Sequence, residues 1–339
     1  MNLERGIFNF RKFISISGFS SVAGEREAKG PLGYRIDRIL KGRLFGEKTF
    51  EKAESKMQQV AVIKAMQNAN LTASEIDAIF AGDLLNQCIG SNYGLRELAI
   101  PFVGVYGACS TMAEAILVAA IFIESGHFRK TISVTSSHFC AAERQFRFPL
   151  EYGGQRPKTS QWTVTAAGAV LLEEGKENGI LIKGGCIGRI VDFGIKDINN
   201  MGAAMAPAAA DTIVRFFKTT RTSCNDYDLI LTGDLGEIGS KALIEILKEE
   251  GFNIEKKHKD CGLLIYNKDE KEINCGGSGP GCSALVLCSD ILKQMQEKKI
   301  KNLLFIATGA LMSKRSSQQG ESIPAVAHLV YLEGEEKWS

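Results

Sequence analysis

The sequence predicts an α/β fold in which two similar halves pack against each other. Four elements occur twice in the same order: an apolar-periodic helix, a strand ending in Gly-Asp-Leu, a glycine turn whose cysteine begins a helix, and a closing strand. The strand ends lie at 82–84 and 233–235, and the cysteine turns lie at 107–110 and 280–283. We infer a duplication, because chance matches would not keep both the order and the spacing.

The spacing between matching residues locates the two halves. It is 151 positions between the two Gly-Asp-Leu ends and 173 positions between Cys109 and Cys282. We expect an N-terminal half at 1–175, a C-terminal half at 176–339 and an insertion in the second half near 251–273. Alternating strands and helices predict layered sheets covered by helices, related by a pseudo-two-fold axis. Binding sites in such folds lie at strand ends and helix N-termini near the join.

Composition narrows the classes of function. The chain has 339 residues, 45% of them hydrophobic and 24% charged, so a large core can form. The net charge of +2 argues against nucleic acid as a partner. The nine cysteines form no zinc-type Cys-x-x-Cys pair, so we expect reduced thiols, no metal site and no cofactor. We also expect a soluble chain of cytoplasmic type without signal peptide or transmembrane helix, because the longest apolar stretch, 113–123, is too short to span a bilayer.

Cys109 has the position of a functional cysteine. It follows a predicted strand at 101–106 and begins a predicted helix, where unpaired N–H groups and a partial positive charge stabilise a thiolate. The same groups can hold a carboxylate or an oxyanion, with Ser110 beside them. The alternative is a buried cysteine that only packs, but a turn at the join of two halves favours a site.

Acyl transfer by Cys109 would need a neighbouring base or cation, most often histidine. The chain has four histidines, and His138 is the candidate because it follows a predicted strand at 131–136 that ends in Ser136. We expect both side chains to face the pocket. The other three histidines are expected at a surface turn, in the insertion and in the core.

The cysteine turn and most of the chain resemble known proteins. GACSTMAEAI at 107–116 resembles the nucleophile turn of thiolases and of β-ketoacyl-acyl-carrier-protein synthase III. Residues from about 10 to 333 are similar to the family of stage V sporulation protein AD of endospore-forming bacteria. The resemblance implies the layered αβαβα fold of the thiolases. Segments that carry it are AGDLLNQ (81–87), AERQFRFPLEYGGQ (142–155), MGAAMAPAAADTI (201–213) and YDLILTGDLGEIGS (227–240).

The resemblance also implies a degenerate active site. Matched to the synthase, the positions of its catalytic His and Asn hold Asp234 and Gly277, the latter followed by Ser278. An anionic Asp raises the pKa of a nearby thiol, and Gly offers no side-chain donor. We therefore expect Cys109 to be a vestigial nucleophile. The alternative is a condensing enzyme that acts on acyl-CoA or an acyl carrier protein through Cys109 with an unusual partner such as His138.

The family is associated with moving dipicolinic acid, pyridine-2,6-dicarboxylic acid, into the developing spore. The resemblance implies a protein that binds this acid, free or as its calcium chelate, and performs no catalysis. A flat aromatic dianion needs an apolar slot and two anion sites. We expect the helix start at Cys109 to be one, and the candidates for the other are the basic residues in the loop after His138: Arg144, Arg147, Arg156 and Lys158.

The resemblance further implies partners. We expect a homodimer that pairs through the strand at 131–136, which we take to be a sheet edge. The chain would lie peripherally at the spore inner membrane with other membrane-bound stage V sporulation proteins. A scaffold of such a complex without any ligand is a third hypothesis.

Overall fold

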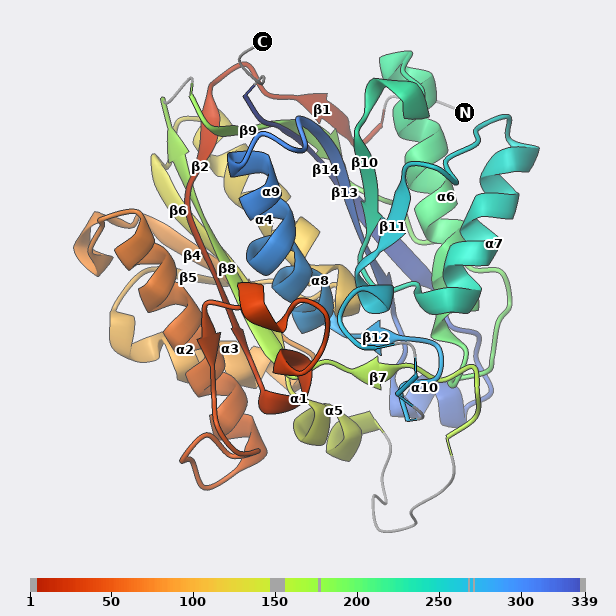
Figure 1. The fold of residues 1–339 in the computed structure, drawn as a ribbon, viewed down its shortest axis with the longest axis horizontal. Coiled ribbons are helices and arrows are strands. Elements are labelled where there is room, and N and C mark those ends of the chain that lie inside the picture. Colours follow the sequence, from red (N-terminus) through yellow and green to blue (C-terminus); the bar gives the residue numbers. More distant parts are fainter. Residues whose placement is uncertain (1–4, 147–155, 176–177, 268, 271, 336–339) are drawn as a thin grey trace.

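The central sheet of the protein repeats one strand order in its two halves (Figure 1). In the computed structural model, residues 5–146, 156–175, 178–267, 269–270 and 272–335 are described. The sheet runs β11-β10-β13-β14-β9-β2-β8-β6-β4-β5. The strands of the first half are β2 (Ile14–Ala23), β4 (Ala78–Gly82), β5 (Phe102–Gly104), β6 (Lys130–Ser137) and β8 (Ala166–Glu174). Those of the second half are β9 (Ile180–Cys186), β10 (Leu229–Thr232), β11 (His258–Asp260), β13 (Asn302–Ala310) and β14 (Ala325–Glu333).

When the five strands of each half are numbered along the chain, their order in the sheet from the outer edge to the join is third, second, fourth, fifth and first. In both halves the second strand is parallel to the third and fourth, and the fifth strand is antiparallel to its two neighbours. The halves join through β2 and β9, which pair antiparallel at Ser15 and Leu181. This topology confirms the predicted α/β fold of two similar halves.

Helices form three layers around the two halves of the sheet (Figure 1). The central layer holds α4 and a second helix built from α8, a π-helical turn and α9, and it packs on both halves of the sheet. One outer layer packs α2 against the first half, and the other packs α6 and α7 against the second half. The helices are α1 (Glu25–Ala28), α2 (Phe50–Asn68), α3 (Ile89–Leu95), α4 (Thr111–Glu124), α5 (Phe139–Phe146), α6 (Met201–Thr220), α7 (Gly236–Glu249), α8 (Pro280–Val286), α9 (Leu292–Gln296) and α10 (Lys314–Gln318). Short strands complete the fold: β1 (Ile7–Asn9), β3 (Arg38–Ile39), β7 (Trp162–Thr163) and β12 (Gly277–Ser278).

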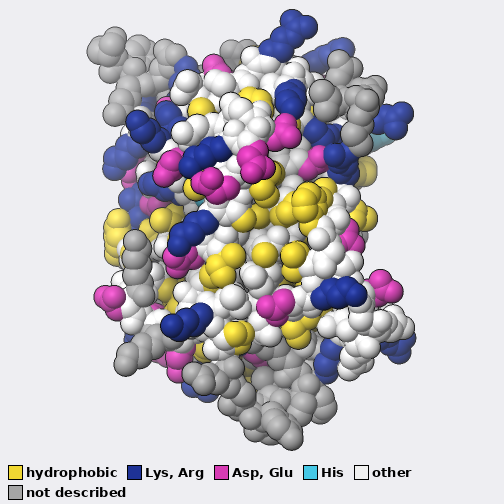
Figure 2. Space-filling view, turned by 90° about the vertical axis from the view of Figure 1, so that its right-hand side faces the viewer, with side chains coloured by type: hydrophobic (Ala, Val, Ile, Leu, Met, Phe, Trp, Pro, Cys, Tyr) yellow, Lys and Arg dark blue, Asp and Glu magenta, His cyan; other side chains and the backbone are white. Residues whose placement is uncertain are grey.

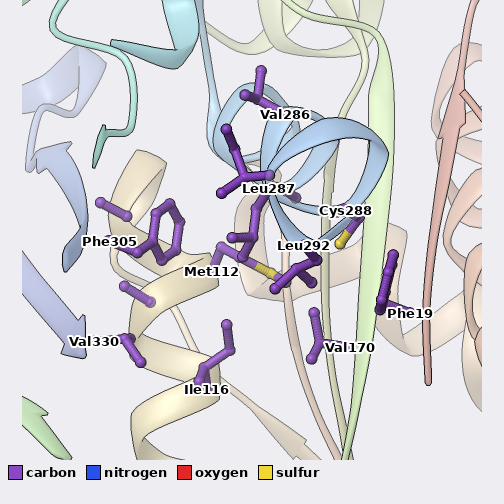
Figure 3. Close-up of a cluster of buried hydrophobic side chains, with 14 of the residues drawn as sticks. Phe19, Met112, Ile116, Val170, Val286, Leu287, Cys288, Leu292, Phe305 and Val330 are labelled. Atoms are coloured by element: carbon purple, nitrogen blue, oxygen red, sulfur yellow. The ribbon is translucent and has the colours of Figure 1, made fainter. Parts of the chain in front are cut away.

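The central helices fix the position of the cysteine turn. Met112 and Ile116 of α4 are fully buried against Leu292 of the second central helix and Phe305 of β13 (Figure 3). Because α4 is apolar on nearly every face, it can stand only between two apolar layers. Burying a side chain of this size is worth about 1.5–3 kcal/mol. The start of α4 is therefore held rigidly where the halves meet.

One expectation about the chain path needs correction. The strand predicted as a sheet edge is β6, which pairs with β4 on one side and β8 on the other. The edge of the first half is β5 instead. Between the last parallel strand and the central helix, the first half has residues 105–107 and the second half has 261–279, a longer segment that overlaps the insertion expected near 251–273. The division of the chain at residue 175 stays a prediction.

The mixture of charged side chains on the surface agrees with the low net charge of the chain. On the face over α6 and α7, basic and acidic side chains are intermixed around hydrophobic side chains that gather near its centre (Figure 2). None of the helices in the described part of the chain is both long and apolar enough to cross a membrane.

Candidate functional site

Cys109 lies in a tight turn that the opposite half of the molecule supports. Residues Ala108–Ser110 form a 3-10 turn before α4, and Ala108 has a left-handed backbone with φ of +52°. The Ser110 hydroxyl donates to the carbonyl of Gly107 at 2.7 Å, which holds this uncommon conformation. A Cβ atom at Gly309 of β13 would lie only 2.0 Å from the same carbonyl oxygen, so glycine is needed for this close approach. The turn is thus locked between the two halves.

Asp234 extends from the second half to this turn. It follows β10 and is fully buried. Its Oδ2 atom accepts hydrogen bonds from the Ser278 hydroxyl at 3.1 Å and from the Gly279 amide at 2.9 Å, and its Oδ1 atom accepts one from the Thr308 hydroxyl at 3.2 Å. The Ser278 oxygen lies 4.0 Å from the sulfur of Cys109. The structure therefore brings together three of the predicted site residues, Cys109, Asp234 and Ser278.

The electrostatics keep the thiol protonated. Burial raises the pKa of Cys109 well above its ordinary value, and the negative charge of Asp234 raises it further. Burial also raises the pKa of Asp234 to about 6, against the hydrogen bonds that favour its charged form. Asp260, which accepts hydrogen bonds from the amides of Leu235 and Gly236, has a pKa of about 7, raised by burial and also by Asp234. A neutral thiol is a poor nucleophile at neutral pH. We expected Asp234 to raise the pKa of the thiol, and its position beside Cys109 agrees with that direction.

A cavity of about 1050 Å³ opens beside the cysteine turn. Cys109 and Ser278 lie in its wall, and both halves contribute to its lining. Many of the lining side chains are carboxamides: Asn86, Gln87, Gln145, Gln161, Asn199 and Gln318. Apolar lining comes from Leu84, Tyr106, Phe146, Met201, Leu311 and Met312. The combination of apolar walls and neutral hydrogen-bonding groups is typical of a small-molecule site.

Few charged side chains line the cavity. Within the described part of the chain they are Glu143, Lys314 and Arg315. Glu143 is neutralised by Arg156, whose guanidinium nitrogen lies 2.5 Å from its carboxylate. Lys314 and Arg315 belong to α10, which follows β13. Sequence reasoning missed this pair, because two basic residues in a polar stretch are also typical of a solvated surface.

Ser110 and Ser136 do not line the cavity, against the expectation from the sequence. The hydroxyl of Ser110 is used inside the cysteine turn. Ser136 lies at the end of β6, where its hydroxyl donates to the carboxyl group of Glu54 at 2.9 Å and accepts from Gln58 at 2.9 Å. Both partners belong to α2, so Ser136 faces the outer layer and not the cavity.

His138 also lies outside the cavity lining. Its Nε2 atom is 2.9 Å from the carbonyl oxygen of Arg43, and its ring packs against Phe45 and Phe50. Burial lowers the pKa of His138 and keeps the ring neutral. The residue was predicted to face the pocket because it follows a strand end, but the side chain turns toward α2 instead.

Of the remaining predicted residues, one lies at the surface, one supports a lining residue through its backbone, and one lies outside the described chain. Arg144 is half-exposed and forms an ion pair with Glu51 at 3.3 Å, away from the cavity lining. Arg147 lies outside the described residues. The carbonyl of Gly277 accepts a hydrogen bond from Gln161 at 2.9 Å, so this glycine supports a lining residue through its backbone. No described group of three or more His, Cys, Asp or Glu side chains is arranged to hold a metal ion.

The repeated strand order and the cysteine turn at the join define a protein of the thiolase-like class. Solved structures agree on this fold. The 3-oxoacyl-[acyl-carrier-protein] synthase III of Aquifex aeolicus superposes with a TM-score of 0.59 at 14% identity, covering 94% of this chain and 99% of its own. A single-residue variant of OleA from Xanthomonas campestris superposes with a TM-score of 0.63 at 13% identity, covering 96% and 98%.

The sequence comparisons are more specific. Residues 5–333 match the family described as stage V sporulation protein AD. The stage V sporulation protein AD of Bacillus subtilis strain 168 is 45% identical over 327 residues, which are 96% of both chains. The chain therefore belongs to the stage V sporulation protein AD family.

Proposed function

We propose that this chain binds dipicolinic acid in the cavity beside Cys109 and performs no acyl transfer. One observation carries the proposal: a buried, hydrogen-bonded Asp234 stands against the thiol where a condensing enzyme needs a base or a cation. A site that retains its cavity and its turn but holds its thiol neutral is suited to binding.

The cavity suits a flat aromatic dicarboxylate. Tyr106 and Met201 offer apolar surface for a pyridine ring, and the side-chain carboxamides of Asn86, Gln87 and Asn199 belong to the same lining. Neutral donors can bind a carboxylate without the desolvation cost that buried cations carry. The calcium chelate is the second form that the site could take, because carboxamide oxygens are also ligands of calcium.

The alternative, a condensing enzyme, requires a partner for the Cys109 thiol. His138 was the candidate, and its ring is engaged with Arg43 and with two phenylalanines away from the cavity lining. None of the histidines of the described chain lines the cavity. These observations favour the binding function over the alternative.

The role in the cell follows from family membership. We propose that the protein delivers dipicolinic acid for uptake into the developing spore, lying peripherally at the spore inner membrane with other stage V sporulation proteins. A scaffold without a ligand would explain the same location, but it would give no reason for a cavity of about 1050 Å³.

Isothermal titration with dipicolinate, with and without calcium, tests the proposal. We expect saturable binding of one ligand per chain, and weaker binding of benzene-1,3-dicarboxylate if the ring nitrogen takes part. Incubation with acyl-CoA followed by mass spectrometry is the companion experiment, and we expect no acyl group on Cys109. Absence of binding in both calcium conditions would contradict the binding function, and acylated Cys109 would support the condensing enzyme.

We further propose a homodimer that forms through β5. Among the strands of the described chain it pairs with β4 alone, so the hydrogen-bonding groups of its other edge remain available. Phe102 and Val103 of β5 are about 40% exposed, as is Ile89, and Tyr93 on the neighbouring α3 is 56% exposed. Exposed apolar side chains beside an open strand edge favour pairing with a second copy over contact with water.

A further inference from the structure

We propose that Lys314 and Arg315 of α10 are the anion receptor of the cavity and select ligands with two carboxylates. This inference rests on the proposed function and adds which residues recognise the second carboxylate. They take the place of the candidates from the sequence: Arg144, Arg147, Arg156 and Lys158.

The fold holds α10 against the cavity from two sides. At the end of β13, Gly309 packs on the cysteine turn, and residues 310–315 together with Gln318 line the cavity. The Leu311 amide donates to the carbonyl of Pro324 at 2.8 Å, which closes the base of this loop. The Ser313 hydroxyl accepts from the Ser316 amide at 3.0 Å and caps the first turn of α10. Lys314 and Arg315 are thereby placed in a loop that is anchored to the wall containing Cys109.

Lys314 and Arg315 are the basic residues among the described residues that line the cavity. Glu143 is the acidic lining residue of the described chain, and Arg156 pairs with it at 2.5 Å. Asp234 lies behind Ser278 and is fully buried. Arg315 is exposed and makes no ion pair with a carboxylate of the described residues. A dianion that enters the cavity therefore meets positive charge at α10 and neutral amides elsewhere.

Two other basic residues near the cavity, Arg156 and Arg144, are held by ion pairs. Arg156 stacks its guanidinium over Trp162 at 4.9 Å in addition to pairing with Glu143. Arg144 pairs with Glu51 of α2 outside the lining. Moving either group to a ligand would break an existing ion pair, whereas Arg315 can turn to a carboxylate without such a loss.

The test compares the binding of two ligands to the wild type and to two variants. Titration calorimetry would measure dipicolinate and picolinate, which has one carboxylate, on the wild type, on Lys314→Gln with Arg315→Gln, and on Arg144→Gln as a matched control. We expect the double variant to lose about tenfold or more in affinity for dipicolinate, because charge-assisted hydrogen bonds are lost. Picolinate should lose less than about threefold, and the control should bind both ligands as the wild type does.

The possible outcomes separate the two proposals. If the wild type binds neither ligand, the proposed function fails and this inference fails with it. If the wild type binds dipicolinate and the double variant binds it equally well, the binding function stands and the role of α10 is refuted. An equal loss for both ligands would refute selection for the second carboxylate. A loss of affinity that shrinks as salt is raised would support the electrostatic origin.

Discussion

The carboxylate of Asp234 faces the thiol of Cys109 across the join of the two halves. Cys109 precedes α4 of the first half, and Asp234 follows β10 of the second half. Neither half alone therefore contains the pair. The charge of Asp234 and the burial of the sulfur act in the same direction, and both raise the pKa of Cys109. The reactivity of one residue can therefore be changed through the other.

Asp234→Asn should make Cys109 more reactive. The substitution keeps the size of the side chain and its hydrogen bonds to Ser278 and Gly279, but it removes the negative charge. A fall of one unit in the thiol pKa gives about tenfold more thiolate at neutral pH. The measurement is the rate of alkylation of Cys109 by iodoacetamide, followed by peptide mass spectrometry. A wild-type rate at pH 7 equal to that of a free thiol would contradict the raised pKa of Cys109.

Substitutions at Cys109 should separate its position from its chemistry. Cys109→Ala removes the sulfur but leaves the backbone of the turn and the cavity wall, so dipicolinate should bind within about threefold of the wild-type affinity. Cys109→Trp places a large ring in the cavity and should abolish binding. Calorimetry measures both, with circular dichroism to check that each variant is folded. Loss of binding in the alanine variant would mean that the sulfur itself contacts the ligand.

The fold could be predicted because the chain carries the same signals twice. A strand that ends in Gly-Asp-Leu and a cysteine turn that begins a helix are local patterns, and their repetition fixed the order of elements without any knowledge of strand pairing. Asp234 was placed in the site by the resemblance to the synthase, whose catalytic His stands at this position, and the structure has it directly after β10 near the join.

Side-chain directions and sheet edges could not be predicted in this way. The segment at 131–136 is rich in β-forming residues, which is typical of a central strand that is buried on both faces, and the structure places β6 there. The edge strand β5 has three residues and gives little local signal. His138 follows a strand end as expected, but the phenylalanines of the α2 side decide where its ring packs.

Glu114→Gln should stabilise the protein at neutral and higher pH. Glu114 lies in the first turn of α4, where its Oε2 atom is buried without a hydrogen-bond partner, and burial raises its pKa from 4.5 to about 7. A carboxyl group with a raised pKa favours the folded state below pH 4.5, and this advantage is lost as the pH rises to about 7. The glutamine variant carries no such charge, so relative to the wild type it should gain about 3 kcal/mol between pH 4 and pH 8.

Urea unfolding across this pH range measures the effect of Glu114. The exposed Glu321 offers a control, since Glu321→Gln should follow the wild-type curve. If the free energies of unfolding of Glu114→Gln and of the wild type changed in parallel with pH, the carboxyl group of Glu114 would titrate in the folded protein as it does in the unfolded chain.

Val103→Lys should convert the expected homodimer into a monomer. Val103 lies in the middle of β5, and a lysine there would put two like charges at an edge where two copies meet. Light scattering should give a dimer mass for the wild type at micromolar concentration and a monomer mass for the variant, with the same circular dichroism. Phe193→Lys is the matched control, because Phe193 is 69% exposed but lies outside β5 and α3. A monomeric wild type would refute the dimer, and dissociation by both substitutions would refute the β5 edge as its interface.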